Sequence, residues 1–200
     1  MPPQFSGLLP DRSRAALLVL DMISTFQFPD GRRLQRTATR IAPRIAALKE
    51  RCKRAGIACI YANDDVGRWR SDSRQLIEDC RKPGSAGAEI VDRLQPEESD
   101  YLILKPRHSA FFATPLDVLL NHLGTRRLIL TGASSHQCVL FTANDAHQRG
   151  LDVIVASDCV AGPSIRDTRF ALQYFARVLG ARVCASRRIR LGPLTRPAGR

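Results

Sequence analysis

Short, continuous apolar segments recur along this chain, and several of them end at a polar residue. The first is Ala15–Leu20, in which every residue is apolar, as in a strand that is buried on both faces of a sheet. Segments of the same kind predict further strands over residues 57–61, 101–104, 127–130, 152–156 and 181–185. The pattern therefore predicts about six strands.

Helical patterns separate these strands. In residues 37–54, apolar side chains recur three or four positions apart, which is the period of one buried helix face. Further helices are predicted from Thr114–Pro115 up to Gly124, over 138–149 and over 166–179. Strands that alternate with helices predict a three-layer α/β/α sandwich around a mostly parallel sheet, in a single domain of residues 1–200.

The chain is strongly basic, but its arginines are scattered. It has 200 residues and a net charge of +12, and no basic stretch is interleaved with aromatic residues as a nucleic-acid platform would be. Nucleic-acid binding is therefore not expected. No apolar run is long enough to span a membrane, and the first residues do not resemble a secretory signal, which predicts a cytoplasmic protein. Residues 187–200 are rich in arginine and predict a flexible basic tail.

The six cysteines differ in their surroundings. None belongs to a Cys-x-x-Cys pair, and the chain is too large to need a disulfide framework, so neither a zinc site nor disulfides are expected. Cys59 and Cys184 lie inside apolar strand-like runs, where a thiol behaves as a small apolar group. Cys138 instead follows a predicted strand and a short turn, which makes it the candidate for chemistry.

Three reactive residues follow the ends of predicted strands. Asp21 comes after the first strand, Lys105 after the third, and Cys138 shortly after the fourth. Ligands of parallel α/β sheets bind beyond the carboxyl ends of the strands, so these residues are expected at one edge. A thiol needs help to become a nucleophile; a carboxylate can take its proton, and an ammonium adds positive charge. Each residue alone could equally be a turn former, a packing residue or a solvated strand end.

The turn before Cys138 consists mainly of small residues, from Gly132 to Gln137. Its backbone N–H groups could point at the oxyanion that forms during attack on a carbonyl. His136 lies two residues before Cys138 and could instead be the base of a Cys–His pair.

Five segments together resemble the isochorismatase-like cysteine hydrolases. They are Leu18–Met22 with Phe26, Lys105–Phe111, Thr131–Val139, Thr142–Ala146 and Ser157–Ala161. The resemblance runs from about residue 14 to 185 and keeps the family's order of Asp, Lys and Cys.

This resemblance implies a catalytic triad in which Asp21 deprotonates Cys138 and Lys105 assists by its charge. The thiolate would attack an amide-like carbonyl to give a thioester, which water then hydrolyses. The resemblance also implies a cis peptide bond between Ala133 and Ser134, with the N–H groups of Ser134 and Cys138 forming the oxyanion hole.

The chain departs from the family's nicotinamidases after the second predicted strand. Those enzymes have an Asp-x-His and a further His there as metal ligands, whereas this chain has Asn63-Asp64-Asp65 and no histidine before His108. We therefore expect no metal and no cofactor. Isochorismatases proper cleave a vinyl ether without a thiol, so Cys138 favours an amidase.

Five residues are candidates for substrate binding: Phe26, Asn63, Trp69, His108 and Phe111. Phe26 and Phe111 lie close in sequence to the proposed triad but would serve equally well in the core. Trp69 lies in a polar loop and could form a pocket wall or an oligomer contact. His108, three residues after Lys105, could line the pocket or cap a loop.

The sequence thus predicts a hydrolase that cleaves an amide, carbamoyl or related C–N bond of a small molecule. The resemblance implies a homo-oligomer, either a dimer or a tetramer. Two alternatives stay open: vinyl-ether hydrolysis that does not use the thiol, and a non-catalytic protein whose basic surface binds an acidic partner.

Overall fold

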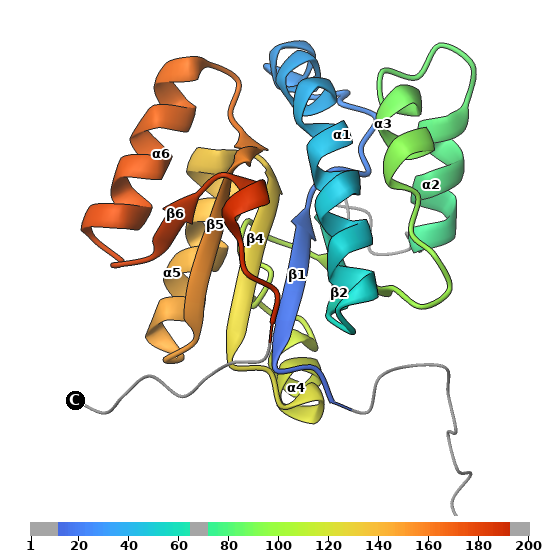
Figure 1. The fold of residues 1–200 in the computed structure, drawn as a ribbon. Helices are drawn as coiled ribbons and strands as arrows, with labels where there is room; N and C mark the ends of the chain where they lie inside the picture. Colours follow the sequence, from blue (N-terminus) through green and yellow to red (C-terminus); the bar gives the residue numbers. More distant parts are fainter. Residues whose placement is uncertain (1–11, 65–71, 193–200) are drawn as a thin grey trace, which may run out of the picture.

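The computed structural model describes residues 12–64 and 72–192, which form one sheet covered by helices on both faces (Figure 1). All six strands run parallel, in the order β3-β2-β1-β4-β5-β6. Their bounds are β1 Ala15–Leu20, β2 Ala58–Asp64, β3 Tyr101–Lys105, β4 Arg127–Ala133, β5 Asp152–Ala161 and β6 Arg182–Cys184. The predicted α/β sandwich is confirmed, and within the described residues every strand pair is parallel.

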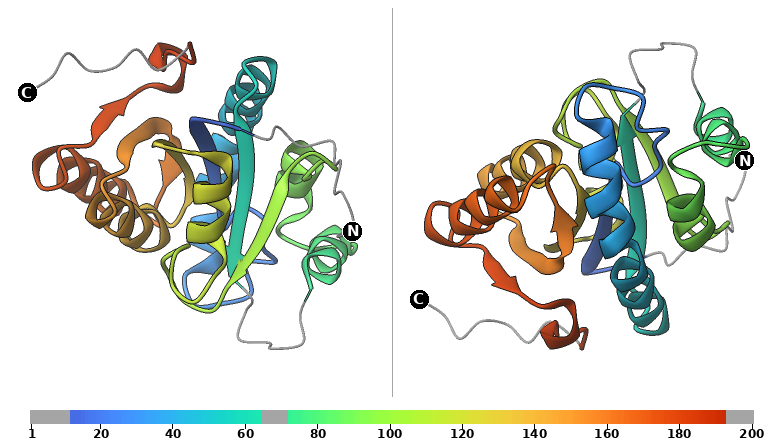
Figure 2. Two further views of the ribbon diagram at one scale, coloured as in Figure 1. Left: turned by 90° about the horizontal axis from the view of Figure 1, so that it is seen from below. Right: turned by 90° about the horizontal axis from the view of Figure 1, so that it is seen from above.

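The helices form two layers, which Figure 2 shows from both ends of the sheet. One face packs against α1 Gly31–Arg54, α2 Ser73–Arg81 and α3 Ala88–Leu94. The other packs against α4 Leu116–Leu123, α5 Leu140–Gln148 and α6 Ile165–Arg177. Each layer buries its own apolar cluster, so the sheet is an interior surface on both sides.

Strand β1 shows why its sequence is apolar throughout. Leu17 and Val19 belong to the cluster beneath α1, whereas Leu18 and Leu20 belong to the cluster on the opposite face. Successive side chains of a strand point to opposite faces, so a strand between two helix layers needs apolar residues at every position. β1 pairs with β2 on one side and β4 on the other, which makes it a central strand.

Helix α1 begins at Gly31, earlier than the predicted residue 37. Leu34 and Ala38 are buried and extend the apolar face by almost two turns toward the N-terminus. Asp30 occupies the N-cap position, but in a left-handed conformation, and its side chain makes no capping hydrogen bond. Gly31 is required for space, because a Cβ there would lie 2.0 Å from the Phe26 carbonyl oxygen.

Two helices, α2 and α3, lie in a part of the sequence for which no element was predicted. Asp72 caps α2 by accepting a hydrogen bond from the Gln75 N–H at 2.7 Å. Strand β2 also extends three residues beyond its predicted end, because Asn63 and Asp64 pair with Leu104 and Lys105 of β3. The polar loop predicted from Asn63 onward is therefore wrong for its first two residues.

The segment around Cys138 also differs from the prediction of an α-helix that starts there. A π-helical turn, η1, covers Ser135–Val139 and leads directly into α5, so Cys138 lies inside helical structure and not at its first residue. Strand β5 continues to Ala161, well past the predicted end at residue 156, and its register with β4 shifts between Leu130 and Gly132.

The flexible tail predicted over residues 187–200 includes residues that are folded in the structure. Ser186–Arg188 forms a 3-10 turn, η2, and Ile189 is 2% exposed. The Arg51 guanidinium donates to the carbonyl oxygens of Ser186 at 2.9 Å and Ile189 at 2.8 Å, which fixes this turn against α1. Residues 187–192 therefore belong to the fold, and residues 193–200 lie outside the described part of the chain.

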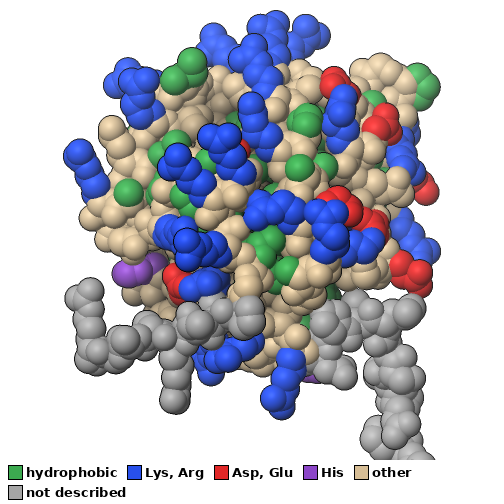
Figure 3. Space-filling view, viewed as in Figure 1, with side chains coloured by type: hydrophobic (Ala, Val, Ile, Leu, Met, Phe, Trp, Pro, Cys, Tyr) green, Lys and Arg blue, Asp and Glu red, His purple; other side chains and the backbone are tan. Residues whose placement is uncertain are grey.

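Lys and Arg side chains are spread over the face of the molecule shown in Figure 3, with apolar and uncharged surface between them. This distribution agrees with a generally basic surface. None of the described helices is long and apolar enough to cross a membrane.

Candidate active site

The carboxyl ends of three strands bring Asp21, Lys105 and Cys138 together. Asp21 directly follows β1 and has a φ angle of 48°, a conformation uncommon for residues other than glycine. Lys105 is the last residue of β3, and Cys138 lies in η1, just beyond β4. The sequence placed these residues at one edge of the sheet, and the structure places them in contact.

Lys105 is the centre of this cluster. Its Nζ lies 2.8 Å from Asp21 Oδ2 and 3.6 Å from the Cys138 sulfur, and it donates to the Arg107 carbonyl oxygen at 3.3 Å. The side chain is fully buried, so the ammonium depends on these three partners in place of water.

Asp21 is held from two further directions. Its Oδ1 accepts a hydrogen bond from the Asp64 N–H at 2.6 Å, which ties the carboxylate to the end of β2. The Cys138 thiol is also its hydrogen-bonding partner. Asp21 therefore contacts both the proposed nucleophile and its cationic neighbour.

Burial dominates the protonation of the cluster. It raises the pKa of Asp21 above its ordinary value, although Lys105 opposes this shift. Burial, followed by the negative charge of Asp21, raises the pKa of the Cys138 thiol to about 12, against the opposing effects of Lys105 and the Ser134 N–H. Burial lowers the pKa of Lys105, but the charges of Asp21 and Cys138 outweigh it, so the net shift is upward. At neutral pH the thiol is thus protonated.

This protonation predicts how Cys138 reacts with an alkylating reagent. We expect the rate of its modification by iodoacetamide to rise about tenfold per pH unit up to at least pH 10 in the folded protein, because the thiolate fraction keeps growing below a pKa of about 12. The same thiol in urea should level off near pH 9. Peptide mass spectrometry resolves Cys138 from the other cysteines, and a plateau near pH 9 in the folded protein would contradict the expectation.

The turn between β4 and η1 has the cis peptide bond between Ala133 and Ser134 that the resemblance implied. The Ser134 N–H is directed at the Cys138 sulfur. Gly132, just before it, has a φ angle of 110°, and a Cβ there would lie 2.1 Å from the Leu20 carbonyl oxygen. Glycine at this position lets the turn approach β1 closely.

His108 is exposed and also contacts the sulfur. Its Nδ1 lies 4.0 Å from Cys138 Sγ, and its ring lies against the Phe141 ring with 5.5 Å between centroids. His136, by contrast, directs its Nδ1 at the Ser134 hydroxyl, 2.9 Å away. The histidine that contacts Cys138 is therefore His108, and not the His136 of the alternative Cys–His pair.

The other predicted substrate-binding residues have different environments. Asn63 is buried and donates from Nδ2 to the Ile23 carbonyl oxygen at 2.8 Å, which holds the loop after β1. Phe111 is 5% exposed, and the Arg149 guanidinium covers its ring at 4.5 Å from the centroid. Phe26 is 4% exposed and packs in the cluster beneath α1. Trp69 lies outside the described residues.

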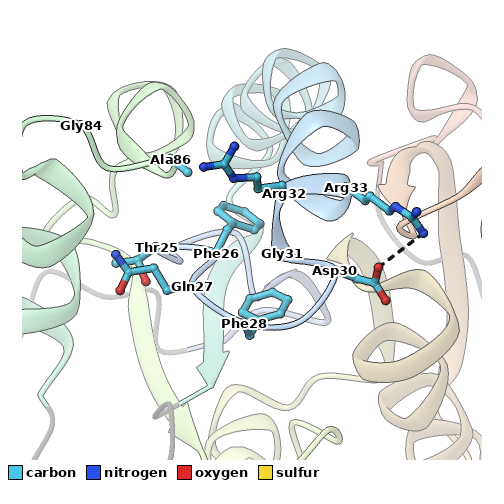
Figure 4. A pocket seen from close by; sticks show the side chains of 10 residues that line it. All are labelled: Thr25, Phe26, Gln27, Phe28, Asp30, Gly31, Arg32, Arg33, Gly84 and Ala86. Carbon is cyan, nitrogen blue, oxygen red and sulfur yellow. Dashed lines mark ion pairs between the residues drawn. The ribbon is translucent and has the colours of Figure 1, made fainter.

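A hollow of about 610 Å³ lies where the chain enters α1 (Figure 4). Phe26 and Phe28 line it, together with Arg32, which extends over Phe26 toward Ala86 in Figure 4. Its lining does not include Asp21, Lys105 or Cys138. The hollow is therefore a feature separate from the cluster around the thiol.

The described part of the chain contains no group of three or more His, Cys, Asp or Glu side chains arranged to hold a metal ion. Asn63 and Asp64, the first residues of the segment that differs from the nicotinamidase pattern, are instead used as structural partners of Ile23 and Asp21.

Comparisons with known proteins agree with this architecture. A family model described as the isochorismatase domain matches residues 15–187. The uncharacterized isochorismatase family protein YaaI of Bacillus subtilis (strain 168) is 38% identical over 174 residues, which are 87% of this chain and 95% of that protein. The chain belongs to the isochorismatase family. The resemblance seen in the sequence is thus confirmed, and the protein is an isochorismatase-family hydrolase.

Two further members show the breadth of the isochorismatase family. Enterobactin synthase component B of Escherichia coli (strain K12) is 33% identical over 167 residues, which cover 82% of this chain but 58% of that protein. N-carbamoylsarcosine amidase from Thermoplasma acidophilum is 30% identical, with a TM-score of 0.63 over 88% of this chain and 99% of that structure.

The sequence did not predict the roles of some residues in the site of this isochorismatase-family protein. The Asp64 N–H and the Arg107 carbonyl group act through the backbone, which carries no side-chain signal. Thr142 and Asp145 of α5 bind the segment after β3. They fall within one of the family-like segments, but their role depends on the packing of α5.

Proposed function

We propose that this protein hydrolyses an amide, carbamoyl or related C–N bond of a small molecule through a thioester at Cys138. The observation that carries the proposal is the contact of one buried ammonium, Lys105 Nζ, with both Asp21 at 2.8 Å and the Cys138 sulfur at 3.6 Å. A nucleophile that touches both a proton acceptor and a cation has what thiol catalysis needs.

In the proposed reaction, Asp21 takes the thiol proton while the sulfur bonds to the carbonyl carbon. The raised pKa of Asp21 suits this step, because a weaker acid is a stronger base. Lys105 stabilises the negative charge on sulfur as it develops. The N–H groups of Ser134 and Cys138 form the proposed oxyanion hole, and Asp21 gives the proton to the leaving nitrogen as the C–N bond breaks.

We propose direct substrate contact for a candidate residue that is exposed, and a packing role for those that are buried. His108 is exposed beside the sulfur and would touch the substrate directly. Phe26, Asn63 and Phe111 are buried and would act by packing around the site. Trp69 stays a candidate from the sequence. We propose no cofactor and a homo-oligomeric assembly.

The amidase proposal is supported by the similarity to N-carbamoylsarcosine amidase over nearly its whole length. A second candidate is vinyl-ether hydrolysis without the thiol, which the similarity to a protein named isochorismatase from Bacillus subtilis favours at 32% identity over 182 residues. The two reactions differ in whether Cys138 forms a covalent bond.

The test is intact-protein mass spectrometry after incubation with a panel of small amides, N-carbamoyl amino acids and ureas, quenched in acid at short times. We expect at least one compound to leave an acyl or carbamoyl group on the protein, which peptide mapping assigns to Cys138. Turnover of a compound without any such adduct, under conditions that trap an adduct from an activated ester, would contradict the thioester.

A further inference from the structure

We propose that His108 is the base that activates water to hydrolyse the thioester, an assignment that rests on the proposed function of Cys138. Two groups that can accept a proton contact the sulfur, and they differ in their exposure to solvent. Asp21 lies in the buried cluster with Lys105, whereas His108 is exposed and approaches Sγ to 4.0 Å through Nδ1. A water molecule that attacks the thioester arrives from the exposed side.

Asp21 is already occupied by its neighbours in the buried cluster. Its Oδ1 accepts the Asp64 N–H at 2.6 Å, and its Oδ2 faces Lys105 Nζ at 2.8 Å. Oδ1 is therefore bonded to the backbone of β2, and Oδ2 forms an ion pair with the ammonium. A separate, exposed base removes the need for one carboxylate to serve both the buried thiol and the incoming water.

The loop that carries His108 is fixed on both sides of that residue. Before it, the Arg107 carbonyl oxygen accepts from Lys105 Nζ at 3.3 Å. After it, Ser109 Oγ donates to Asp145 at 2.5 Å, and the Ala110 N–H donates to Thr142 Oγ1 at 3.0 Å. A catalytic base must be held in place by its surroundings, and these contacts to β3 and α5 hold the loop.

The ring of His108 is oriented as well. It lies against Phe141 of α5 with 5.5 Å between centroids and 33° between planes, and Phe141 is itself half exposed. This contact limits rotation of an otherwise exposed side chain and keeps Nδ1 toward the sulfur. The structure thus keeps in one orientation a histidine that solvent can reach.

The step balances without a further reactant. Nδ1 of His108 takes a proton from water as the water oxygen bonds to the thioester carbonyl carbon. The C–S bond then breaks with its electron pair on sulfur, and His108 returns the proton to Sγ across the 4.0 Å contact. The products are a carboxylic acid, or a carbamic acid from a carbamoyl substrate, and the free Cys138 thiol, and nothing is oxidised or reduced.

The experiment uses p-nitrophenyl acetate, whose good leaving group forms the acetyl thioester without help from a proton donor. In His108→Phe, which keeps an aromatic ring against Phe141, we expect a burst of one p-nitrophenolate per protein, followed by a steady-state rate about 100-fold below that of the parent. Acid-quenched protein should then carry one acetyl group on Cys138. His122→Phe, which alters an exposed histidine of α4, is the matched control and should behave like the parent.

A second variant separates base catalysis from packing. In His108→Ala, added imidazole should restore hydrolysis of the acetyl group in proportion to its concentration. If the His108 ring only packs against its neighbours, added imidazole should have no effect. An unchanged steady-state rate in His108→Phe, a lost first turnover, or an absent imidazole effect would each overturn the assignment while leaving Cys138 as the nucleophile. Failure of the parent protein to acquire any acetyl group would instead count against the proposed function, and the role of His108 would fall with it.

Discussion

Replacing Cys138 with alanine is expected to abolish C–N bond hydrolysis, with a fall in kcat/KM of at least about 10⁴-fold, because no other group replaces the atom that bonds to the carbonyl carbon. The folded state should be nearly unaffected, since the exchange removes one sulfur from a residue that is 8% exposed and has no disulfide. The measurement is steady-state turnover of whichever amide or carbamoyl compound acylates the parent protein.

Cys184→Ala is the matched control for this loss. Cys184 is a free, partly buried thiol on β6, three strands away from β1, and its removal should leave turnover within about twofold. The same pair of variants separates the two candidate reactions. If the true substrate is a vinyl ether and Cys138→Ala still turns it over at the parent rate, the thioester mechanism is wrong.

Lys105→Met is expected to reduce both stability and activity. The ammonium is fully buried and pairs with Asp21 at 2.8 Å, so its removal leaves a carboxylate in the protein interior without a cation. Breaking a buried pair in this way costs about 3–5 kcal/mol of the free energy of unfolding. Urea denaturation followed by circular dichroism measures the loss at neutral pH.

The pH dependence of this variant has a definite sign. Burial already raises the pKa of Asp21 above that of an unfolded chain, and loss of Lys105 raises it further. Between the unfolded and folded pKa values the folded state holds more protons, so stability falls as pH rises through this window. The penalty of Lys105→Met should therefore be smallest below about pH 4, where Asp21 is protonated in both states.

A double variant shows whether the penalty comes from Asp21. Asp21→Asn with Lys105→Met removes the buried charge, and we expect it to recover about half or more of the stability that Lys105→Met loses, while activity stays absent. Additive losses from the two single changes would instead show that the contact between these side chains contributes little to stability.

Much of the site could be predicted from the sequence because its three reactive residues follow strands. Asp21 and Lys105 end continuous apolar runs, and the carboxyl ends of parallel strands share one edge. The fold followed from the same runs, since Leu17 and Leu18 could both be apolar only between two helix layers. These inferences needed only the apolar pattern within each segment and the rule that the carboxyl ends of parallel strands share one edge of the sheet.

The remaining parts depended on contacts between distant segments. The sequence offered His136 as a base for Cys138 and His108 as a residue that could line the pocket. The structure brings His108 to the sulfur, because Asp145 and Thr142 hold the loop that carries it. Asn63 was a substrate-binding candidate, but the extension of β2 places its amide against Ile23. The helices α2 and α3 are short, and α2 buries only Cys80, so neither gives a sustained helical period in the sequence.

The strand order has a consequence for how the chain folds. Asp21 and Lys105 belong to the half of the sheet built from β1, β2 and β3, whereas Cys138 arrives with β4, which pairs Leu130 with Leu18 across more than half of the chain. During synthesis, β1, β2 and β3 can pair with one another before β4 is made. Until then, the edge of the apolar strand β1 that pairs with β4 stays uncovered. Closure of this long-range contact is slow, and an exposed apolar edge promotes aggregation. Chains that stall before β4 are therefore the form most in need of chaperone protection.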